Sequence, residues 1–292
     1  MKVYVVIAVH NRKKYTLNCL SLLEKQTFQN FEVIIVDDGS DDGTSNDIKA
    51  IYPHVKIIHG DGSWWWTRSM NEGFKVALDE GADLIITLNN DVSFDENLIQ
   101  NLIELNEQHP DSLIGCLNLI HRKKPYVFFS GIKKNIWWKA KEVKYHKAFS
   151  LLEKDELKGL HHTTCLNGRG TLIPRAVFEK VGLLDELSFP QYASDYDFVL
   201  RASNYGFPAF ITWDVAISSF IEETGEGKSF IDQSWLAFIR SFFNRYSSTS
   251  IRMWVKYYIR HAGIGAMSGV VFQVLRQIYA FKRKRNLLNT LK

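Results

Sequence analysis

Leu84-Ile85-Ile86-Thr87-Leu88-Asn89-Asn90-Asp91 is an apolar run that ends on two amides and a carboxylate. The run is short, so it fits a strand buried on both faces, and such strands occur in parallel sheets that helices cover. In open α/β sheets ligands bind outside the carboxyl ends of the strands, so Asp91 could meet a cation or a phosphate there. The alternative is that Asp91 or Ser93 caps a following helix, and this segment alone leaves both interpretations open.

Three other strand patterns precede this run, and helical patterns separate all four. We expect these strands at residues 1–9, 31–36 and 55–58, and helices at 15–26, 44–51 and 67–80. Repeated alternation of strand and helix predicts a parallel sheet with helices on both faces. The fold class predicted from the sequence is therefore α/β, with a mostly parallel central sheet.

The second half of the chain is less regular. We expect strands at 113–120, 126–130 and 210–217, and a long basic and aromatic excursion over 133–160. We also expect a helix at 175–181 and a second helix that Ser194 caps and that ends before Gly206. Beyond Gly227 the pattern is helical, with apolar residues on one face and basic residues on the other. We therefore divide the chain into a domain at 1–227, with halves 1–110 and 111–227, and a basic helical region at 228–292.

Length and composition suggest one large domain, or one domain plus an appendage, in a protein whose cysteines are reduced. The chain has 292 residues, 46% of them hydrophobic, and its three cysteines form no C-x-x-C pair. This argues against a disulfide framework and against a zinc site. The weakly polar run 262–275 falls short of the ~20 residues that a spanning helix needs, so we expect no transmembrane helix.

The charge is divided unevenly along the chain. Residues 230–292 carry eleven Lys/Arg and one acidic residue, a net charge of +10, whereas residues 1–229 carry −6. A basic amphipathic segment, here 250–285, suits an anionic membrane surface. Nucleic acid fits less well, because the acidic part would repel it and no recognition module is evident. A helical hairpin that packs on the domain and leaves one face in water is the simpler alternative.

An acidic loop follows the second strand. Asp37-Asp38-Gly39-Ser40 should lie at the same edge of the sheet as Asp91, and carboxylates there can accept hydrogen bonds from a ribose or a base. An Asp/Gly turn without a ligand is the commoner case. The loop has neither a dinucleotide-binding glycine pattern nor a P-loop.

Several motifs in chain order resemble those of one enzyme family. They are Ala8-Val9-His10-Asn11-Arg12, Gln26-Thr27, residues 31–44, Asn71-Glu72-Gly73, Asn89-Asn90-Asp91, residues 168–185 and residues 194–201. Their order resembles that of the family 2 inverting glycosyltransferases, and most of all the bacterial rhamnosyltransferase-like members. The resemblance covers roughly residues 3–220.

The resemblance implies a GT-A fold that binds a nucleotide-diphospho-sugar over its first half and an acceptor over its second. Asp38 would contact the nucleobase, with Asp37, Ala8 and His10 nearby. The final carboxylate of the family's Asp-x-Asp falls on Asp91, which would hold Mg²⁺ or Mn²⁺ against the diphosphate. The other donor-side residues expected are Arg68, Asn71, Asn89 and Asn90.

On the acceptor side, the resemblance places the general base at Asp195, which would deprotonate the acceptor hydroxyl, with Asp197 as second choice. For both, a simple interaction with the helix dipole is the alternative. The remaining acceptor-binding residues expected are Trp65, Trp66, Gly168, Arg169 and Gly170.

The tryptophans belong to a segment that replaces the family's small, glycine-rich donor loop. In Trp64-Trp65-Trp66 the rings could stack on apolar sugar faces, and Arg68 could meet a phosphate. Alternatively, the rings could simply cover the edge of the sheet. Trp137-Trp138 and His161-His162 receive no role.

Three departures from the family pattern reduce the number of charged groups. Ser194 stands where the family usually has Glu, Asn89 where it has Asp, and Ser218-Ser219 where many members carry a metal-binding His. We therefore expect a weakly held divalent cation.

The function expected from the sequence is transfer of a hexose or deoxyhexose, rhamnose among them, to a glycan or lipid-linked glycan acceptor during surface-polysaccharide synthesis. The enzyme would be peripheral at the cytoplasmic face of the cell membrane. Two alternatives are a membrane-attached module that binds sugar nucleotides without catalysis, and a sugar-1-phosphate nucleotidyltransferase. The latter should have a glycine-rich triphosphate loop after the first strand, where His10-Asn11-Arg12 stands instead.

Overall fold

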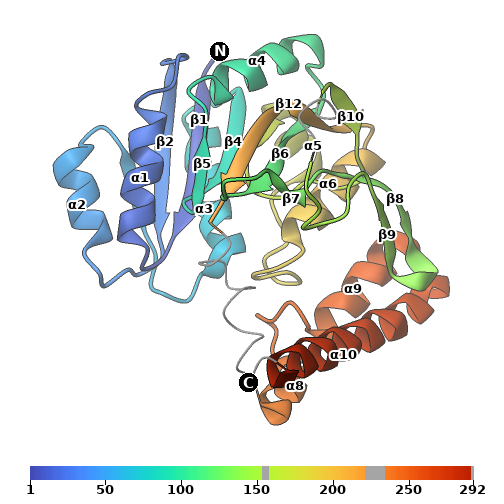
Figure 1. Cartoon of the computed structure of the whole chain (residues 1–292). Helices are drawn as coiled ribbons and strands as arrows, with labels where there is room; N and C mark the ends of the chain where they lie inside the picture. The colour runs from blue at the N-terminus through green and yellow to red at the C-terminus, as the bar shows by residue number, and fades with distance from the viewer. Residues whose placement is uncertain (153–157, 221–233, 291–292) are drawn as a thin grey trace.

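The computed structural model describes residues 1–152, 158–220 and 234–290, with side chains described as far as Lys282 (Figure 1). Its centre is one large sheet. The strands of this sheet are β1 (Val3–Val9), β2 (Phe31–Asp37), β3 (Lys56–His59), β4 (Leu84–Asn89), β5 (Val92–Phe94), β6 (Leu113–Ile120), β7 (Tyr126–Phe129), β10 (Leu160–His162), β11 (Thr171–Pro174) and β12 (Ala209–Ser219). Their order is β10-β12-β6-β11-β4-β1-β2-β3, with β5 beside β12 and β7 beside β6.

Most neighbouring strands in the main row run parallel. β1 pairs in parallel with β2 and β4, β2 with β3, and β6 with β12. β11 is antiparallel to both β4 and β6, and β5, β7 and β10 add antiparallel pairs at the β6–β12 side. The expected α/β fold with a mostly parallel sheet is confirmed.

Helices cover both faces of the sheet, as the sequence predicts. α1 (Lys13–Leu23), α2 (Thr44–Ile51) and α4 (Leu98–Gln108) pack on one face, where Leu20, Ile48 and Leu102 join the buried core. α3 (Trp65–Asp79), α5 (Arg175–Val181) and α6 (Ser194–Asn204) pack on the other, through Phe74 and Phe198 among others. The central strands β1, β2 and β4 are mostly apolar because helices cover both of their faces.

The excursion expected at 133–160 contains more structure than its sequence pattern suggested. β8 (Ile132–Ile136) and β9 (Lys141–Lys144) form a separate antiparallel hairpin, joined by the short 3-10 helix η1 (Trp137–Lys139). The sequence did not reveal these two strands, because their polar and apolar residues do not alternate regularly. Residues 153–157 of the predicted excursion lie outside the described residues.

The C-terminal region is helical, as expected. It contains α8 (Trp235–Ser241), α9 (Ile251–Ala262), the 3-10 helix η4 (Ile264–Ala266) and α10 (Met267–Thr290), which lie below the sheet next to the β8–β9 hairpin (Figure 1). A small core of its own joins Met253 and Tyr257 of α9 to Phe189 of the main domain. The predicted boundary at residues 227 and 228 falls outside the described residues.

One helix departs from the expectation about membranes. The stretch Ile264–Lys282, which includes η4 and the first part of α10, is long and apolar enough to cross a membrane by length and composition alone, with a mean hydropathy of 1.2. The sequence estimate stopped at residue 275 and missed the apolar residues that follow Arg276. Length and composition in a single helix are weak evidence for a span.

Gly73 allows α3 to approach the sheet closely. A Cβ atom at Gly73 would lie 2.4 Å from Cγ1 of Val6 on β1 and 3.1 Å from Cγ2 of Val36 on β2. Overpacking costs about 1–3 kcal/mol, and alanine gains ~1 kcal/mol over glycine in a helix, so we predict that Gly73→Ala destabilises the protein by a net amount of up to about 2 kcal/mol. Urea unfolding measures the change. Gly265→Ala is the control, because a Cβ there meets nothing within 4 Å, and equal stability of the two variants would contradict the prediction.

Candidate active site

The carboxyl ends of three neighbouring strands bring the first predicted residues together. Ala8 of β1 lies opposite Val36 of β2 on one side and Asn89 of β4 on the other, and Val9 lies opposite Asp37. The polar residues that follow β1, β2 and β4 therefore share one edge of the sheet, as the sequence predicted.

Asp38 is buried and organises the neighbouring loop. Its Oδ1 accepts a hydrogen bond from the Gly62 N–H at 2.8 Å, and its Oδ2 accepts one from the Trp65 N–H at 2.9 Å. The resemblance assigned Asp38 to the nucleobase, whereas in this structure its carboxylate holds the loop that borders the sheet edge. Asp37, also buried, accepts hydrogen bonds from the Ser40 N–H and the Ser45 hydroxyl.

His10 is exposed at the same edge. Its Nδ1 lies 2.6 Å from the Asp38 carbonyl oxygen. A carbonyl can only accept a hydrogen bond, so Nδ1 carries the proton, and in the neutral ring Nε2 is then an acceptor. Asn11 Nδ2 lies 3.4 Å from this Nε2 atom, so His10 is engaged by its neighbours at the edge where the sugar nucleotide is expected.

The three tryptophans have three different environments. The Trp64 ring carries the Arg68 guanidinium 4.9 Å from its centroid. Trp65 is 42% exposed, has a left-handed φ of 59°, and stacks on Tyr246 with ring centroids 4.3 Å apart. Trp66 packs against Gly168, where a Cβ would lie 2.3 Å from its ring. Trp65 therefore has the most exposed ring, and Arg68 stands beside Trp64 at the surface.

Two predicted donor residues use their side chains inside the protein. Both hydrogen-bonding groups of Asn71 engage the backbone of Leu184, and its amide also donates to Glu186. Asn90 is buried and donates to the Thr16 hydroxyl at 2.9 Å. These amides connect α3 and the end of β4 to neighbouring segments, and the donor-binding role expected for both residues stays a prediction.

The segment at the end of β4, where we expect the metal ion, contains oxygen atoms without hydrogen-bond partners. Within the described residues, Oδ1 of Asn89 and Oδ1 of Asp91 are buried and have no hydrogen-bond partner. The other oxygen of Asp91 accepts a hydrogen bond from Arg12 Nη1 at 3.1 Å. Mg²⁺ and Mn²⁺ prefer oxygen ligands and share them with substrate phosphates and water, so these two oxygens fit such an ion as part of its ligand set. The described residues contain no cluster of three or more His, Cys, Asp or Glu suited to a metal ion.

Asp195 lies on the other side of the site, beside the turn at residues 168–170. Its Oδ2 accepts from the Gly168 N–H at 3.2 Å and its Oδ1 from the Tyr196 N–H at 2.9 Å. Burial raises the pKa of Asp195 to about 6, although these hydrogen bonds and the charge of Arg169 oppose the rise. A carboxylate with such a pKa is a stronger base than an ordinary aspartate and is still ionised near neutral pH.

The turn beside Asp195 is fixed to the sheet. The Gly170 N–H donates to the Thr87 carbonyl of β4 at 2.8 Å, and Gly170 has a left-handed φ of 76°. The Arg169 guanidinium lies over the Phe128 ring, 4.9 Å from its centroid. A small pocket lined by Trp66, Gly168 and Asp195, among others, opens here.

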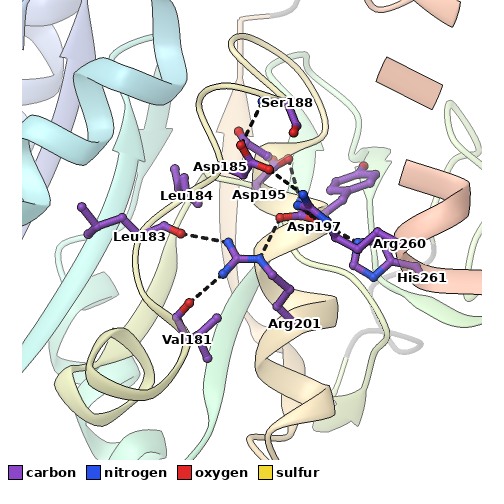
Figure 2. Close-up of polar contacts among 12 residues, drawn as sticks. Val181, Leu183, Leu184, Asp185, Ser188, Asp195, Asp197, Arg201, Arg260 and His261 are labelled. Carbon is purple, nitrogen blue, oxygen red and sulfur yellow. Dashed lines mark hydrogen bonds and ion pairs between the residues drawn. The ribbon is translucent and has the colours of Figure 1, made fainter. Parts of the chain in front are cut away.

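Asp197, the second choice for the base, has a structural environment (Figure 2). Its side chain is fully buried and interacts with Arg201, Arg260 and His261 at 2.8–2.9 Å. Burial alone would raise the pKa of Asp197, but hydrogen bonds from these three residues hold it below its usual value. A carboxylate so enclosed cannot take a proton from an acceptor, so the structure favours Asp195.

Three residues near the site were not assigned from the sequence. Arg12 belongs to a quoted motif, but nothing in the sequence indicated its pairing with Asp91. His121 stacks near Phe220, whose N–H donates to the Asp91 carbonyl at 3.0 Å. Tyr246 reaches Trp65 from the C-terminal region. Each contact joins distant parts of the chain, so no local pattern could have revealed it.

Comparisons with curated proteins give relatives that are glycosyltransferases. Glycosyltransferase GlyG of Streptococcus pneumoniae is 32% identical over 115 residues, which are 38% of this chain and 37% of GlyG. The dTDP-rhamnosyl transferase RfbF of Shigella flexneri is 27% identical over 216 residues, 73% of this chain and 67% of RfbF. The matches thus span about a third to two thirds of these relatives.

Comparison with solved structures supports the fold. The crystal structure of GalNAc-T7 with UDP, GalNAc and Mn²⁺ matches with a TM-score of 0.65 and 14% identity, over 89% of this chain and 48% of that one. The expected GT-A fold is thereby confirmed. Residues 4–182, more than half of the chain, match the sequence profile of the family described as Glycosyl transferase family 2, and the chain belongs to this family.

Proposed function

We propose that this protein is an inverting glycosyltransferase that moves a hexose or deoxyhexose from a nucleotide-diphospho-sugar to a glycan acceptor. The observation that carries the proposal is Asp195, a base with a pKa of about 6 at the start of α6 and beside the turn at 168–170. That turn is hydrogen-bonded to β4, whose end also bears Asn89 and Asp91. A base and a candidate diphosphate site thus flank one turn of the protein.

In this mechanism Asp195 accepts the proton of an acceptor hydroxyl. The hydroxyl oxygen forms a bond to the anomeric carbon while the bond from that carbon to the diphosphate breaks on the opposite face, which inverts the configuration. The electron pair of the broken bond leaves with the nucleoside diphosphate. His10 and Arg68 are exposed near the edge of the sheet and would orient the donor, and the Trp65 ring offers an apolar face to a sugar.

A divalent cation would be held by Asp91 and Asn89, whose free oxygens fit it. When bound, it would neutralise charge that develops on the diphosphate leaving group. Arg12 already places a positive charge on Asp91, so we propose that the cation binds weakly without the nucleotide. The structurally similar GalNAc-T7 was solved with both UDP and Mn²⁺, which supports testing a nucleotide and Mn²⁺ together on this protein.

RfbF supplies the first donor to test. RfbF is a dTDP-rhamnosyl transferase, and it aligns with 73% of this chain at 27% identity. We therefore propose dTDP-rhamnose as the first candidate donor, followed by UDP-sugars and GDP-mannose.

We also propose that the protein works at the cytoplasmic face of the membrane on a lipid-linked acceptor in surface-polysaccharide synthesis. Val271, Leu275 and Tyr279 follow each other at four-residue spacing on α10 and are 60%, 55% and 66% exposed. The surrounding region carries a net charge of +10. An exposed apolar stripe with basic residues suits the surface of an anionic bilayer.

Asp195→Asn should reduce transfer from the active donor by about 10²–10⁴-fold, because an amide cannot accept the proton. Calorimetric binding of the donor should be unchanged. Transfer by the Asn variant at the wild-type rate would contradict the mechanism, and an absence of both transfer and donor hydrolysis in the wild type would favour a non-catalytic binding module.

The wild-type rate should also depend on pH. Asp195 acts in its ionised form, and its pKa is raised to about 6. We predict that kcat falls tenfold per unit below about pH 6 and reaches a plateau above it. An acidic limb centred near pH 4, the usual range of aspartate, would contradict the assignment.

Mn²⁺ with dTDP or UDP should raise the melting temperature more than either ligand alone. Asp91→Ala should remove the increment due to Mn²⁺, because it removes the charged oxygen ligand, and leave most of the effect of the nucleotide. Glu72→Ala, which changes an acidic residue on the exposed side of α3, is the control. An unchanged Mn²⁺ increment in Asp91→Ala would place the cation elsewhere.

Vesicles of phosphatidylglycerol and phosphatidylcholine should sediment the protein, and vesicles of phosphatidylcholine alone should not. We expect the double change Val271→Gln and Leu275→Gln to weaken sedimentation at least tenfold, because it removes the apolar stripe. Ile51→Gln, an equally exposed change on α2, is the control. Extraction of the protein from cell membranes at pH 11 would support peripheral attachment, whereas resistance to extraction would favour a spanning helix.

A further inference from the structure

The helix that bears Asp195 is joined to the C-terminal region by an ionic cluster around the buried Asp197 (Figure 2). Arg260 of α9 donates to Oδ1 of Asp197 at 2.8 Å and to Oδ2 of Asp185 at 2.6 Å. Nε2 of His261 lies 2.9 Å from the same oxygen of Asp197, and Arg201 donates to its other oxygen at 2.8 Å. Two of these three partners of Asp197 come from α9, far away in the sequence.

The burial of Asp197 makes these partners necessary. Its side chain is 0% exposed, and that of His261 is 2% exposed. A carboxylate removed from water is stable only when donors replace the lost hydration, and removal of one partner leaves uncompensated charge. Arg201 cannot serve Asp197 alone, because it also donates to the carbonyls of Val181 and Leu183. The start of α6 therefore depends on α9.

The entry into α6 requires such support. Ala193, the residue before the helix, has a left-handed φ of 65°, a conformation that is costly for a residue other than glycine. The sequence suggested Ser194 as the helix cap, but Ser194 is the first helical residue, and its hydroxyl lies 2.8 Å from that of Thr67. The Asp197 N–H donates to the Ala193 carbonyl at 2.9 Å. Asp195 thus lies within the single turn that Asp197 anchors.

The same helix also holds the loop that leads into α6. Lys256 of α9 donates to the Ser188 hydroxyl at 3.1 Å, in addition to the bridge from Arg260 to Asp185. The loop is fixed on its far side by Thr67, whose hydroxyl donates to the Phe189 carbonyl at 2.6 Å. The segment between Asp185 and Asp195 is therefore held between α3 and α9.

We propose that Arg260 and His261 are positioning residues for Asp195, and that they act by anchoring Asp197 and the loop before it. The C-terminal region is then part of the catalytic unit as well as a candidate membrane contact. The kinetic part of this inference rests on the proposed function, whereas the geometric part does not. The opposing explanation is an interface that adds stability without affecting the orientation of Asp195.

The first experiment needs no substrate. Hydrogen exchange of the full-length protein is compared among the wild type, Arg260→Met, Arg260→Lys and Arg252→Met. Arg252 is exposed on the same helix, so its variant removes the same charge without the cluster. We expect amides of residues 194–198 to exchange at least tenfold faster in Arg260→Met, and less so in Arg260→Lys. Exchange equal to that of Arg252→Met would overturn the proposal.

The second experiment follows the Asp195 carboxyl by ¹³C NMR as pH is varied. The titratable and charged groups around it are Arg169, Cys165 and Tyr257, together with the Asp197 cluster. If Arg260→Met displaces Asp195 from the Gly168 and Tyr196 N–H groups, whose hydrogen bonds lower its pKa, that pKa should rise, and Arg260→Lys should bring it most of the way back to the wild-type value. A purely stabilising interface predicts no change in any variant.

The third experiment measures nucleotide release from dTDP-rhamnose with a glycan acceptor. We expect Arg260→Met to lower kcat at least tenfold with the donor KM within twofold, and Arg260→Lys to recover part of the loss. A change in melting temperature with kcat unaltered would overturn the positioning role. If Arg260→Met does not fold, His261→Gln, which keeps a donor near Asp197, is compared with His261→Leu, and equal kcat values in these two would overturn the role of His261.

An inactive wild type separates the two proposals. If no nucleotide is released from any donor tested, the proposed function fails, and exchange and the carboxyl pKa still decide whether α9 positions α6.

Discussion

The parallel pairing of β1 with β2 and β4 is the constraint on which the site depends. Residues along these strands, such as Ile7, Ile35 and Ile86, are completely buried, so a polar group within a strand would lose its hydration. Polar side chains gather where the strands end, as with Asp37 on β2 and Asn89 on β4. Because the three strands are in register, those ends meet along one edge, and the loops that follow β1, β2 and β4 are directed into a common space.

The unbroken apolar runs in the sequence made the central strands of the sheet predictable. The run at 84–91 and the similar run at 31–36 are too apolar for exposed strands, and the order of helices between them permits few arrangements. The location of Asp195 at the start of a helix was also predicted, from the position of a motif. The pKa of its carboxyl was not, because burial there depends on residues 165–169 and on α9.

The hydrogen-bond partners of each polar side chain at the site could not be predicted from the sequence. Asn71, Asn89 and Asn90 are the same residue type at the same edge, yet Asn71 binds the Leu184 backbone, Asn90 binds Thr16, and Asn89 keeps a buried unpaired oxygen. These differences arise from segments that approach from elsewhere in the chain. The motifs therefore predicted which strand ends share one edge, but not which side chains there are occupied by partners within the protein.

The stack of Trp65 on Tyr246 has a consequence for how this chain can be re-engineered. The most exposed of the three tryptophan rings is supported by a residue from the C-terminal region, and its backbone is held in a conformation unusual for tryptophan. If this loop were replaced by the corresponding loop of a relative, the new loop would not be matched to the Tyr246 ring. The loop that contains Trp65 and the C-terminal segment that contains Tyr246 should therefore be exchanged together. A chimera whose junction lies between them would lose the stacked pair.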